Sequence, residues 1–380
     1  MKIVIATDSF KGTLRADEAC NIITEVATNI LTDVVLVQKP MADGGEGTAR
    51  AMISATGGQW ISQEVMGPLE KMRVKAGFAW LPDKTAVVEM ATASGIELLS
   101  TDQLDPMKTT TYGTGELIKA AINYKASKFF LAVGGSATVD GGVGAAMALG
   151  WKFLDKNGES VPLGGRGLER IVKILPPETF TNQNEKRKVC PIEVLCDVDN
   201  PLCGEQGAAR IYGPQKGATP QIVERLEAGL VNLAQLICEK LHKDIANVPG
   251  AGAAGGLAGG ALAFMNAKLV SGIETIMTHS KLHDELKTAD WVITGEGCFD
   301  RQSLSGKVVA GVVKMAQQTR TRIAVIAGQV NLPPKEYNQM GIDVAIATKP
   351  DNMPIEEALK NSRELLRSAT QHFIEKCLLK

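Results

Sequence analysis

The feature that most constrains the fold is a series of short, continuous apolar runs separated by helix-length segments. Near the start, residues 3–7 (IVIAT) and 34–38 (VVLVQ) flank a segment whose apolar residues recur at helical spacing from Ala19 to Ile30. Apolar runs of this kind are typical of strands buried on both faces of a parallel sheet. Because strands that alternate with helices favour such a sheet, we predict a β-α-β-α start with a second helix over 48–56.

The same pattern returns near the C-terminal end. It predicts strands near 291–294, 322–328 and 343–347, with a helix over 306–319. Residues 355–378 predict one long amphipathic helix. Its apolar side would contain Ile355, Leu359, Leu366, Ala369, Phe373 and Cys377.

The middle of the chain has a different pattern. Residues 72–90 alternate around the turn LPDK and predict a hairpin, and residues 151–161 predict another with its turn at Asn157-Gly158. Between them, 128–133 predicts a strand and 143–150 a helix.

We therefore expect an α/β protein with two α/β domains. Residues 1–62 plus 266–380 would form a doubly wound, flavodoxin- or Rossmann-like parallel sheet built from both chain ends. Residues 63–265 would form an inserted, mixed α/β domain.

Composition excludes several classes of function. The 41 basic and 42 acidic residues nearly cancel, and aromatic residues make up only 4% of the 380 residues. Nucleic-acid and polybasic membrane surfaces are therefore not expected. Residues 248–267 carry no charge over about the length of a membrane span. Their many glycines would weaken a helix, and they indicate a packed loop and helix of a soluble protein.

Cysteine usage points to a reducing compartment. The seven cysteines contain no CxxC pair, and the apolar run at the N-terminus is shorter than a secretion signal requires. We therefore expect reduced thiols and a cytoplasmic protein, either a monomer or a homodimer.

Loops rich in glycine and acidic residues follow the predicted strands, where open α/β sheets bind ligands. Phosphoryl transfer needs N–H groups or lysine for phosphate and carboxylates for Mg²⁺. The loops that supply these groups are DSFKG (8–12), PMADGGEGT (40–48), GGSATVDGGVG (134–144), CDVDNP (196–201) and TGEGCFDRQSLSGK (294–307).

Each loop also has a purely structural interpretation. Glycine-rich turns can serve packing alone, Asp197 and Asp199 can cap a turn before Pro201, and Lys11 can be a solvated lysine. The sequence has no GxxxxGK[ST] phosphate loop and no zinc motif around His279 and His283.

The set of loops and their order along the chain identify a protein family more specifically than any single loop does. DSFKG, PMADGGEGT, EMATASG, GTGE, GGSATVDGG, CDVDNPL, GPQKGA, PGAGAAGGL and TGEG…GK occur in this order across the chain. In this respect the sequence resembles bacterial glycerate kinases, the glycerate 2-kinases of glyoxylate and sugar-acid pathways. The resemblance implies transfer of the γ-phosphoryl of ATP to D-glycerate with Mg²⁺, mainly giving 2-phosphoglycerate rather than 3-phosphoglycerate. It also implies two α/β domains with the active site in the cleft between them.

The match to the family pattern is not complete. Thr7, Val139, Cys298 and Val309 depart from it. The matching positions are Asp140, Glu296, Asp300, Gln302, Ser303 and Lys307.

The roles of individual residues are hypotheses. We expect Asp197 to act as the base or as a Mg²⁺ ligand beside Asp199, with Lys11 and Asp8 also in the catalytic site. The substrate would contact Asp8, Ser9, Asp43, Gly44 and Glu46. The nucleotide would contact Gly135, Ser136, Thr138, Asp140, Glu296, Asp300 and Lys307.

Two other classes of function are compatible with the sequence. GAGAAG at 250–255 matches the dinucleotide pattern GxGxxG, although no clear strand precedes it, so an NAD(P)-dependent hydroxy-acid dehydrogenase is one alternative. A non-catalytic protein that binds small acids is the other.

Overall fold

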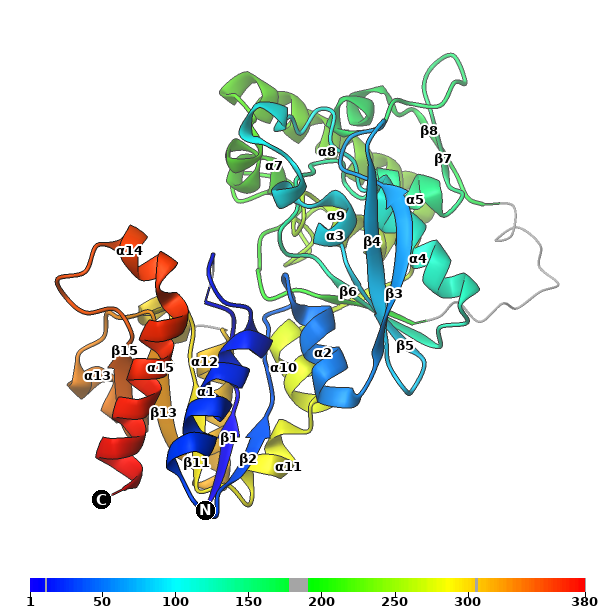
Figure 1. Ribbon diagram of the computed structural model, residues 1–380. Coiled ribbons are helices and arrows are strands. Elements are labelled where there is room, and N and C mark those ends of the chain that lie inside the picture. Colours follow the sequence, from blue (N-terminus) through cyan, green and yellow to red (C-terminus); the bar gives the residue numbers. More distant parts are fainter. Residues whose placement is uncertain (11, 178–190, 305–306, 380) are drawn as a thin grey trace. The chain divides into compact units, whose positions relative to one another are not determined.

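A computed structural model describes residues 1–10, 12–177, 191–304 and 307–379 (Figure 1). The chain forms two compact units. The terminal unit contains Met1–Asp43, Arg50–Gly57 and Ile273–Lys380, and the inserted unit contains Gly44–Ala49 and Gly58–Gly272.

The terminal unit is built on a five-stranded parallel sheet in the order β15-β13-β11-β1-β2. Numbered within this unit, the order is 2-1-3-4-5, that of flavodoxin-like folds, so the predicted doubly wound sheet from both chain ends is confirmed. Its strands are β1 (Lys2–Ile5), β2 (Val35–Gln38), β11 (Trp291–Thr294), β13 (Arg322–Ala327) and β15 (Val344–Ala347).

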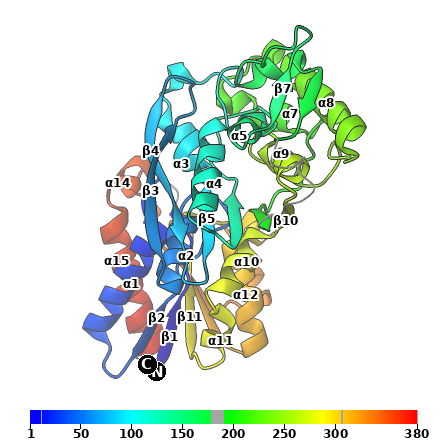
Figure 2. The same ribbon diagram turned by 90° about the vertical axis from the view of Figure 1, so that its right-hand side faces the viewer.

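Helices cover both faces of this sheet. Figure 2 shows α1 and α15 on one face and α10, α11 and α12 on the other. Buried side chains such as Ile23 and Phe373 fill the space beneath α1 and α15, and the rings of Phe373 and Trp291 meet edge to face at 5.2 Å. The helices are α1 (Ala16–Ile30), α10 (Gly272–His279), α11 (Leu282–Leu286), α12 (Val308–Thr319) and α15 (Ser362–Phe373).

The prediction of one helix over 355–378 is wrong. The chain forms α14 (Ile355–Lys360), α15 and a π-helical turn at Ile374–Leu378. Leu366, Ala369 and Phe373 are buried as predicted, but Ile355 and Leu359 are 59% and 48% exposed. Helix α14 ends at Lys360 and α15 begins at Ser362. The apolar residues on either side of this break therefore do not lie on one helix face, although their spacing in the sequence is helical.

The inserted unit contains a six-stranded mixed sheet in the order β10-β9-β6-β5-β4-β3. Its strands are β3 (Gln59–Met66), β4 (Arg73–Trp80), β5 (Thr85–Glu89), β6 (Lys128–Ala132), β9 (Ile192–Leu195) and β10 (Lys268–Val270). The β4–β5 hairpin is confirmed. Strand β3 was not predicted, because this edge strand is largely exposed and has no clear apolar face.

The unit boundaries in the structure differ from the predicted ones. The predicted boundary at 62–63 falls inside β3, which pairs with β4 over its whole length. Residues 268–270 pair with β9, which places them with the inserted unit and not with the C-terminal segment.

The second predicted hairpin forms only in part. Gly158 has a φ of 79° and the Asp155 N–H bonds to the Glu159 carbonyl, so the turn is present. Leu154 and Ser160 form an antiparallel bridge across the turn, and the Val161 N–H donates to the Phe153 carbonyl at 3.0 Å. The residues after the turn do not extend into a strand, and β7 (Lys152–Leu154) also pairs with β8 (Lys173–Leu175).

The remaining α-helices and strands lie outside the two main sheets. They are α2 (Thr48–Thr56), α3 (Ala91–Ser94), α4 (Tyr112–Asn123), α5 (Val143–Ala148), α7 (Ala208–Tyr212), α8 (Pro220–Leu241), α9 (Leu257–Phe264), β12 (Cys298–Phe299), β14 (Gln329–Val330) and α13 (Pro334–Gln339).

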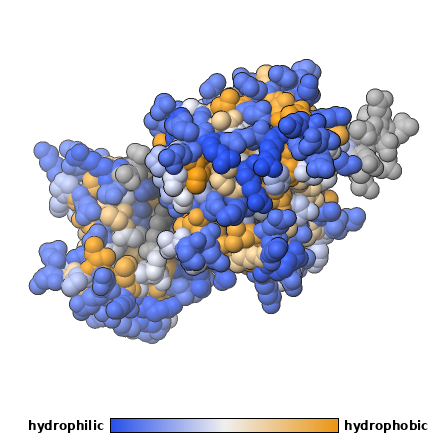
Figure 3. Space-filling model, turned by 90° about the horizontal axis from the view of Figure 1, so that it is seen from above, coloured by the Kyte–Doolittle hydropathy of each residue, from blue (hydrophilic) through white to orange (hydrophobic). Residues whose placement is uncertain are grey.

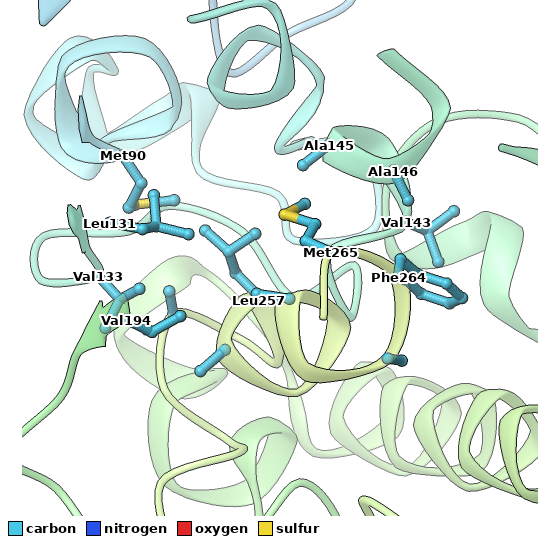
Figure 4. Packing of buried hydrophobic residues seen from close by; sticks show 14 of the residues in the cluster. Met90, Leu131, Val133, Val143, Ala145, Ala146, Val194, Leu257, Phe264 and Met265 are labelled. Atoms are coloured by element: carbon cyan, nitrogen blue, oxygen red, sulfur yellow. The ribbon is translucent and has the colours of Figure 1, made fainter. Parts of the chain in front are cut away.

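The uncharged segment over 248–267 lies inside the inserted unit. Figure 4 shows Leu257, Phe264 and Met265 packed among sheet residues such as Leu131 and among residues of α5 such as Val143. No helix in the described part of the chain has the length and apolarity needed to cross a bilayer. On the face shown in Figure 3, hydrophilic residues predominate and apolar areas lie between them.

Candidate active site

A pocket of about 330 Å³ lies in the terminal unit, at the carboxyl ends of its parallel strands. Its lining includes Asp8 after β1, Glu296 after β11, Gly328 after β13 and Thr348 after β15. The strand order reverses between β1 and β11. A ligand site is expected at this switch point in an open α/β sheet.

Several predicted site residues meet in this pocket. Asp8, Ser9 and Asp43 come from the N-terminal segment, and Glu296, Asp300 and Lys307 come from 294–307. The Asp8 N–H donates to the Gly295 carbonyl at 2.8 Å, which fixes the loop after β1 against the loop after β11.

The acidic side chains differ in how the protein holds them. Glu296 is only 8% exposed. The Asp8 carboxylate accepts a hydrogen bond from the Ser9 N–H at 2.6 Å, and the Asp300 carboxylate accepts one from the Ser303 N–H at 3.2 Å. Lys307 is the N-cap of α12. A positive charge there opposes the helix dipole, which favours a bound anion nearby.

One wall of the pocket is apolar. Ile355, Ala358 and Leu359 of α14 line it together with Phe10. Ile355 and Leu359 are 59% and 48% exposed, so they offer apolar surface to a ligand in the pocket. The pocket therefore combines carboxylates, the two lysines Lys307 and Lys349, and an apolar side, a mixture typical of small-molecule sites.

The glycine-rich loop 134–144 belongs to the inserted unit and is organised around Asp140. This residue is fully buried and accepts hydrogen bonds from the side chain and N–H of Thr111 and from the N–H groups of Gly142 and Gly144. Burial raises the pKa of Asp140. The carboxylate is surrounded by protein donors and fixes the loop, so its predicted contact with a nucleotide stays a prediction.

The other predicted residues of this loop differ in exposure. Gly135 is exposed with a φ of 73°, Ser136 is half-buried and Thr138 is fully buried. Within the described residues, the Thr138 hydroxyl has no hydrogen-bond partner.

Lys216 is a functional candidate that the sequence analysis missed. It is 2% exposed, and its Nζ donates to Ser136 Oγ at 2.6 Å and to the Thr138 carbonyl at 2.8 Å. Burial lowers its pKa to about 7, while the negative charge of Asp140 acts in the opposite direction. The signal in the sequence is the motif GPQKGA at 213–218, which contains this lysine.

Asp197 and Asp199 are exposed in the inserted unit. Asp197 Oδ1 accepts hydrogen bonds from Ser271 Oγ at 2.8 Å and from the Gly272 N–H at 3.1 Å. This is a capping contact at the first residue of α10. The catalytic role of Asp197 and the metal-binding role of both residues stay predictions.

The loop PMADGGEGT is divided between the units. Asp43 lines the pocket of the terminal unit, whereas Gly44 packs in the inserted unit, where a Cβ would lie 3.0 Å from Leu195. Its φ of 83° also favours glycine. Glu46 is exposed, and Lys11 lies outside the described residues.

Comparison with known proteins decides the family. The family model described as the glycerate kinase family matches residues 3–378. The chain belongs to the glycerate kinase family. The predicted resemblance is therefore confirmed, and so is the prediction that the protein is a kinase.

Relatives of this family member match over almost their whole length. The glycerate 2-kinase of Escherichia coli K12 is 41% identical, covering 98% of this chain and 97% of the relative. A glycerate kinase of Haemophilus influenzae is 42% identical, covering 98% and 96%. A crystal structure assigned to glycerate kinase 2 of Salmonella typhimurium LT2 matches with a TM-score of 0.85 and 41% identity, covering 99% and 97%.

The dinucleotide alternative does not fit the geometry of this family member. Residues 250–255 form turns that lead into α9 without a strand immediately before them. A Cβ at Gly255 would lie 1.9 Å from the Thr138 carbonyl oxygen. These glycines therefore permit close packing between two loops.

Proposed function

We propose that this glycerate kinase transfers the γ-phosphoryl of ATP to the 2-hydroxyl of D-glycerate with Mg²⁺, giving 2-phosphoglycerate. The observation that carries the proposal is the terminal-unit pocket, where carboxylates and Lys307 surround one space at the switch point of a flavodoxin-like sheet. The Escherichia coli relative is named glycerate 2-kinase, which supports the choice of hydroxyl.

The size of the pocket supports a reactant larger than glycerate alone. Its volume of about 330 Å³ falls within the roughly 300–1,000 Å³ of small-molecule and cofactor sites. We assign its apolar wall, which includes Ile355 and Leu359, to the base of the nucleotide. Lys307 would provide a positive charge for phosphate.

The residues of the pocket fit a magnesium ion. Mg²⁺ prefers oxygen ligands and usually takes only one or two carboxylates, with water and phosphate completing its coordination. Asp8, Asp43, Glu296 and Asp300 offer such oxygens. Among the described residues no three acidic, cysteine or histidine side chains form a metal cluster. When bound, the ion would neutralise phosphate charge.

In the proposed reaction the glycerate oxygen forms a bond to the γ-phosphorus, and the bond from that phosphorus to the β–γ bridging oxygen breaks. ADP leaves with the electrons of the broken bond, and the hydroxyl proton passes to a carboxylate. We propose Asp8 or Asp43 as hydroxyl contacts, and Asp197 stays a candidate base. Positioning and charge neutralisation should contribute more than the base, because the transition state is loose.

A coupled assay of ADP formation tests this proposal. We expect turnover that requires D-glycerate and stops when EDTA removes Mg²⁺. Asp43→Asn should lower kcat/KM by about 100-fold, whereas Asp284→Asn, an exposed acid of α11 in the same unit, should leave it unchanged. ADP formation that does not depend on glycerate, or equal rates for both variants, would refute the proposal.

We also propose a cytoplasmic location. The six described cysteines are free thiols, as expected in a reducing compartment. Glycerate and ATP are the proposed partners.

A further inference from the structure

The contact between Lys216 and the glycine-rich loop extends the proposed function. Lysine is a donor without any acceptor atom, so in its 2.6 Å contact with Ser136 the hydroxyl oxygen must accept when the amine is charged. The hydroxyl hydrogen is then left to donate to something else. Because Ser136 is only half-buried, that hydrogen can reach a ligand.

The backbone around Ser136 is fixed by neighbouring segments. The Gly135 carbonyl accepts from the Ile96 N–H at 2.8 Å, and the Ala137 N–H donates to the Ser94 carbonyl at 3.0 Å. Thr109 Oγ1 donates to the Ala137 carbonyl at 2.7 Å. A rigid backbone of this kind holds a side-chain donor in one place, which reduces the entropy lost on binding.

A second observation points to a ligand at this loop. The Thr138 side chain is fully buried, and its hydroxyl has no partner among the described residues. Leaving a buried hydroxyl unpaired is unfavourable, so a group that completes its hydrogen bonding is expected. Such a group would lie close to the Lys216 amine, which donates to the Thr138 carbonyl.

We propose that Lys216 is a positioning residue that orients the Ser136 hydroxyl as a hydrogen-bond donor to an anionic oxygen of a reactant. Lys216 itself is 2% exposed and donates to Ser136, so it acts through the serine and through its charge. The oxygen belongs to a phosphoryl group or to the glycerate carboxylate. This inference rests on the proposed kinase reaction.

A double-mutant cycle tests the proposal. The variants are Lys216→Met, Ser136→Ala and both together. Lys243→Met is the matched control, because Lys243 also donates to two carbonyls of the inserted unit, those of Leu262 and Ala263, but does not contact this loop.

We expect each single variant to lower kcat/KM by about tenfold, the loss of one hydrogen bond to a charged group, mainly through the KM of one reactant. The double variant should also lose about tenfold, because both changes remove the same donor. A raised KM for ATP would show that the oxygen that accepts from Ser136 belongs to a phosphoryl group. A raised KM for glycerate would show that it belongs to the glycerate carboxylate.

Three results would overturn the inference. These are additive losses of about 100-fold in the double variant, equal effects of Lys216→Met and Lys243→Met, or a loss spread evenly over both KM values. An inactive wild-type enzyme would instead refute the kinase proposal, so the two failures are distinguishable.

A pH profile gives a test that does not require Lys216→Met to fold. Asp140 and Tyr212 are the titratable groups that face the lysine. Wild-type kcat/KM should fall as pH rises through about 7, the pKa of Lys216, and Ser136→Ala should lack this fall. Identical profiles for the two proteins would contradict the proposal.

Discussion

Lys216→Met should stabilise the protein even though it impairs turnover. Burial lowers the pKa of this lysine from 10.5 to about 7. At about 1.4 kcal/mol per unit, keeping the amine charged inside the protein costs about 5 kcal/mol below pH 7. Methionine has a similar length and removes this cost.

Part of that gain is lost again. The Thr138 carbonyl would lose the hydrogen bond from Lys216, and an unpaired buried acceptor costs about 1–3 kcal/mol. The net expectation is a free energy of unfolding about 2 kcal/mol higher than that of the wild type at pH 6.

The pH dependence of this difference has a definite sign. Between pH 7 and 10.5 the unfolded wild type binds more protons at this position than the folded protein. The wild type therefore gains stability as pH rises through this window. Lys216→Met lacks this gain. The excess of its free energy of unfolding over that of the wild type should therefore shrink as pH rises and disappear near pH 10, where the variant differs from the wild type only by the lost hydrogen bonds.

Urea unfolding at pH 6 and pH 10 measures both effects. Tryptophan fluorescence should report unfolding, since Trp60, Trp80 and Trp151 lie in the inserted unit and Trp291 in the terminal unit. Equal slopes with denaturant would show that the unfolded state is unchanged. Lys243→Met serves as the control. A Lys216→Met variant that is less stable than the wild type at pH 6, or an advantage that is the same at both pH values, would refute the reasoning.

Three further predictions concern the loops and the pocket. Asp140→Asn should lower the free energy of unfolding by about 3 kcal/mol in urea experiments, because the amide cannot accept from all the donors that surround the carboxylate; a loss below about 1 kcal/mol would show that the donors find other partners. Gly255→Ala should give little folded protein by circular dichroism, since its Cβ would lie 1.9 Å from the Thr138 oxygen at a φ of 64°, and wild-type stability would show that the loop can move apart. Leu359→Ser should raise the KM for ATP by about tenfold and change stability by less than about 0.5 kcal/mol, because this side chain is 48% exposed at the pocket wall; an unchanged KM would remove the apolar wall from the nucleotide site.

Strong local patterns predicted most of the fold. The buried strands β1, β11 and β13 are continuous apolar runs whose type depends little on distant contacts. Strand β3 was missed because it is an edge strand stabilised by pairing with β4, which no local pattern shows. The break after Lys360 was missed because apolar periodicity continues through it in the sequence but not in space.

The sequence predicted which residue types form the candidate site better than it predicted the hydrogen-bond partners of those residues. Asp8 and Glu296 follow predicted strands, and both line one pocket because the carboxyl ends of parallel strands share an edge. The roles within loop 134–144 depended on tertiary contacts. Asp140 proved to be enclosed by donors from Thr111, and Lys216 reaches Ser136 across 80 residues of sequence. Spacing in the sequence does not show either contact.

The phosphorus-31 NMR spectrum of the product tests the central claim most directly. The purified protein is incubated with ATP, Mg²⁺ and D-glycerate, and the proton-coupled spectrum is recorded. In 2-phosphoglycerate the phosphorus couples through oxygen to a single proton and gives a doublet, whereas in 3-phosphoglycerate it couples to two protons and gives a triplet. We predict a new doublet that grows with the signals of ADP. A triplet would contradict the proposed hydroxyl, and ATP signals that stay unchanged would contradict phosphorylation of glycerate by this protein.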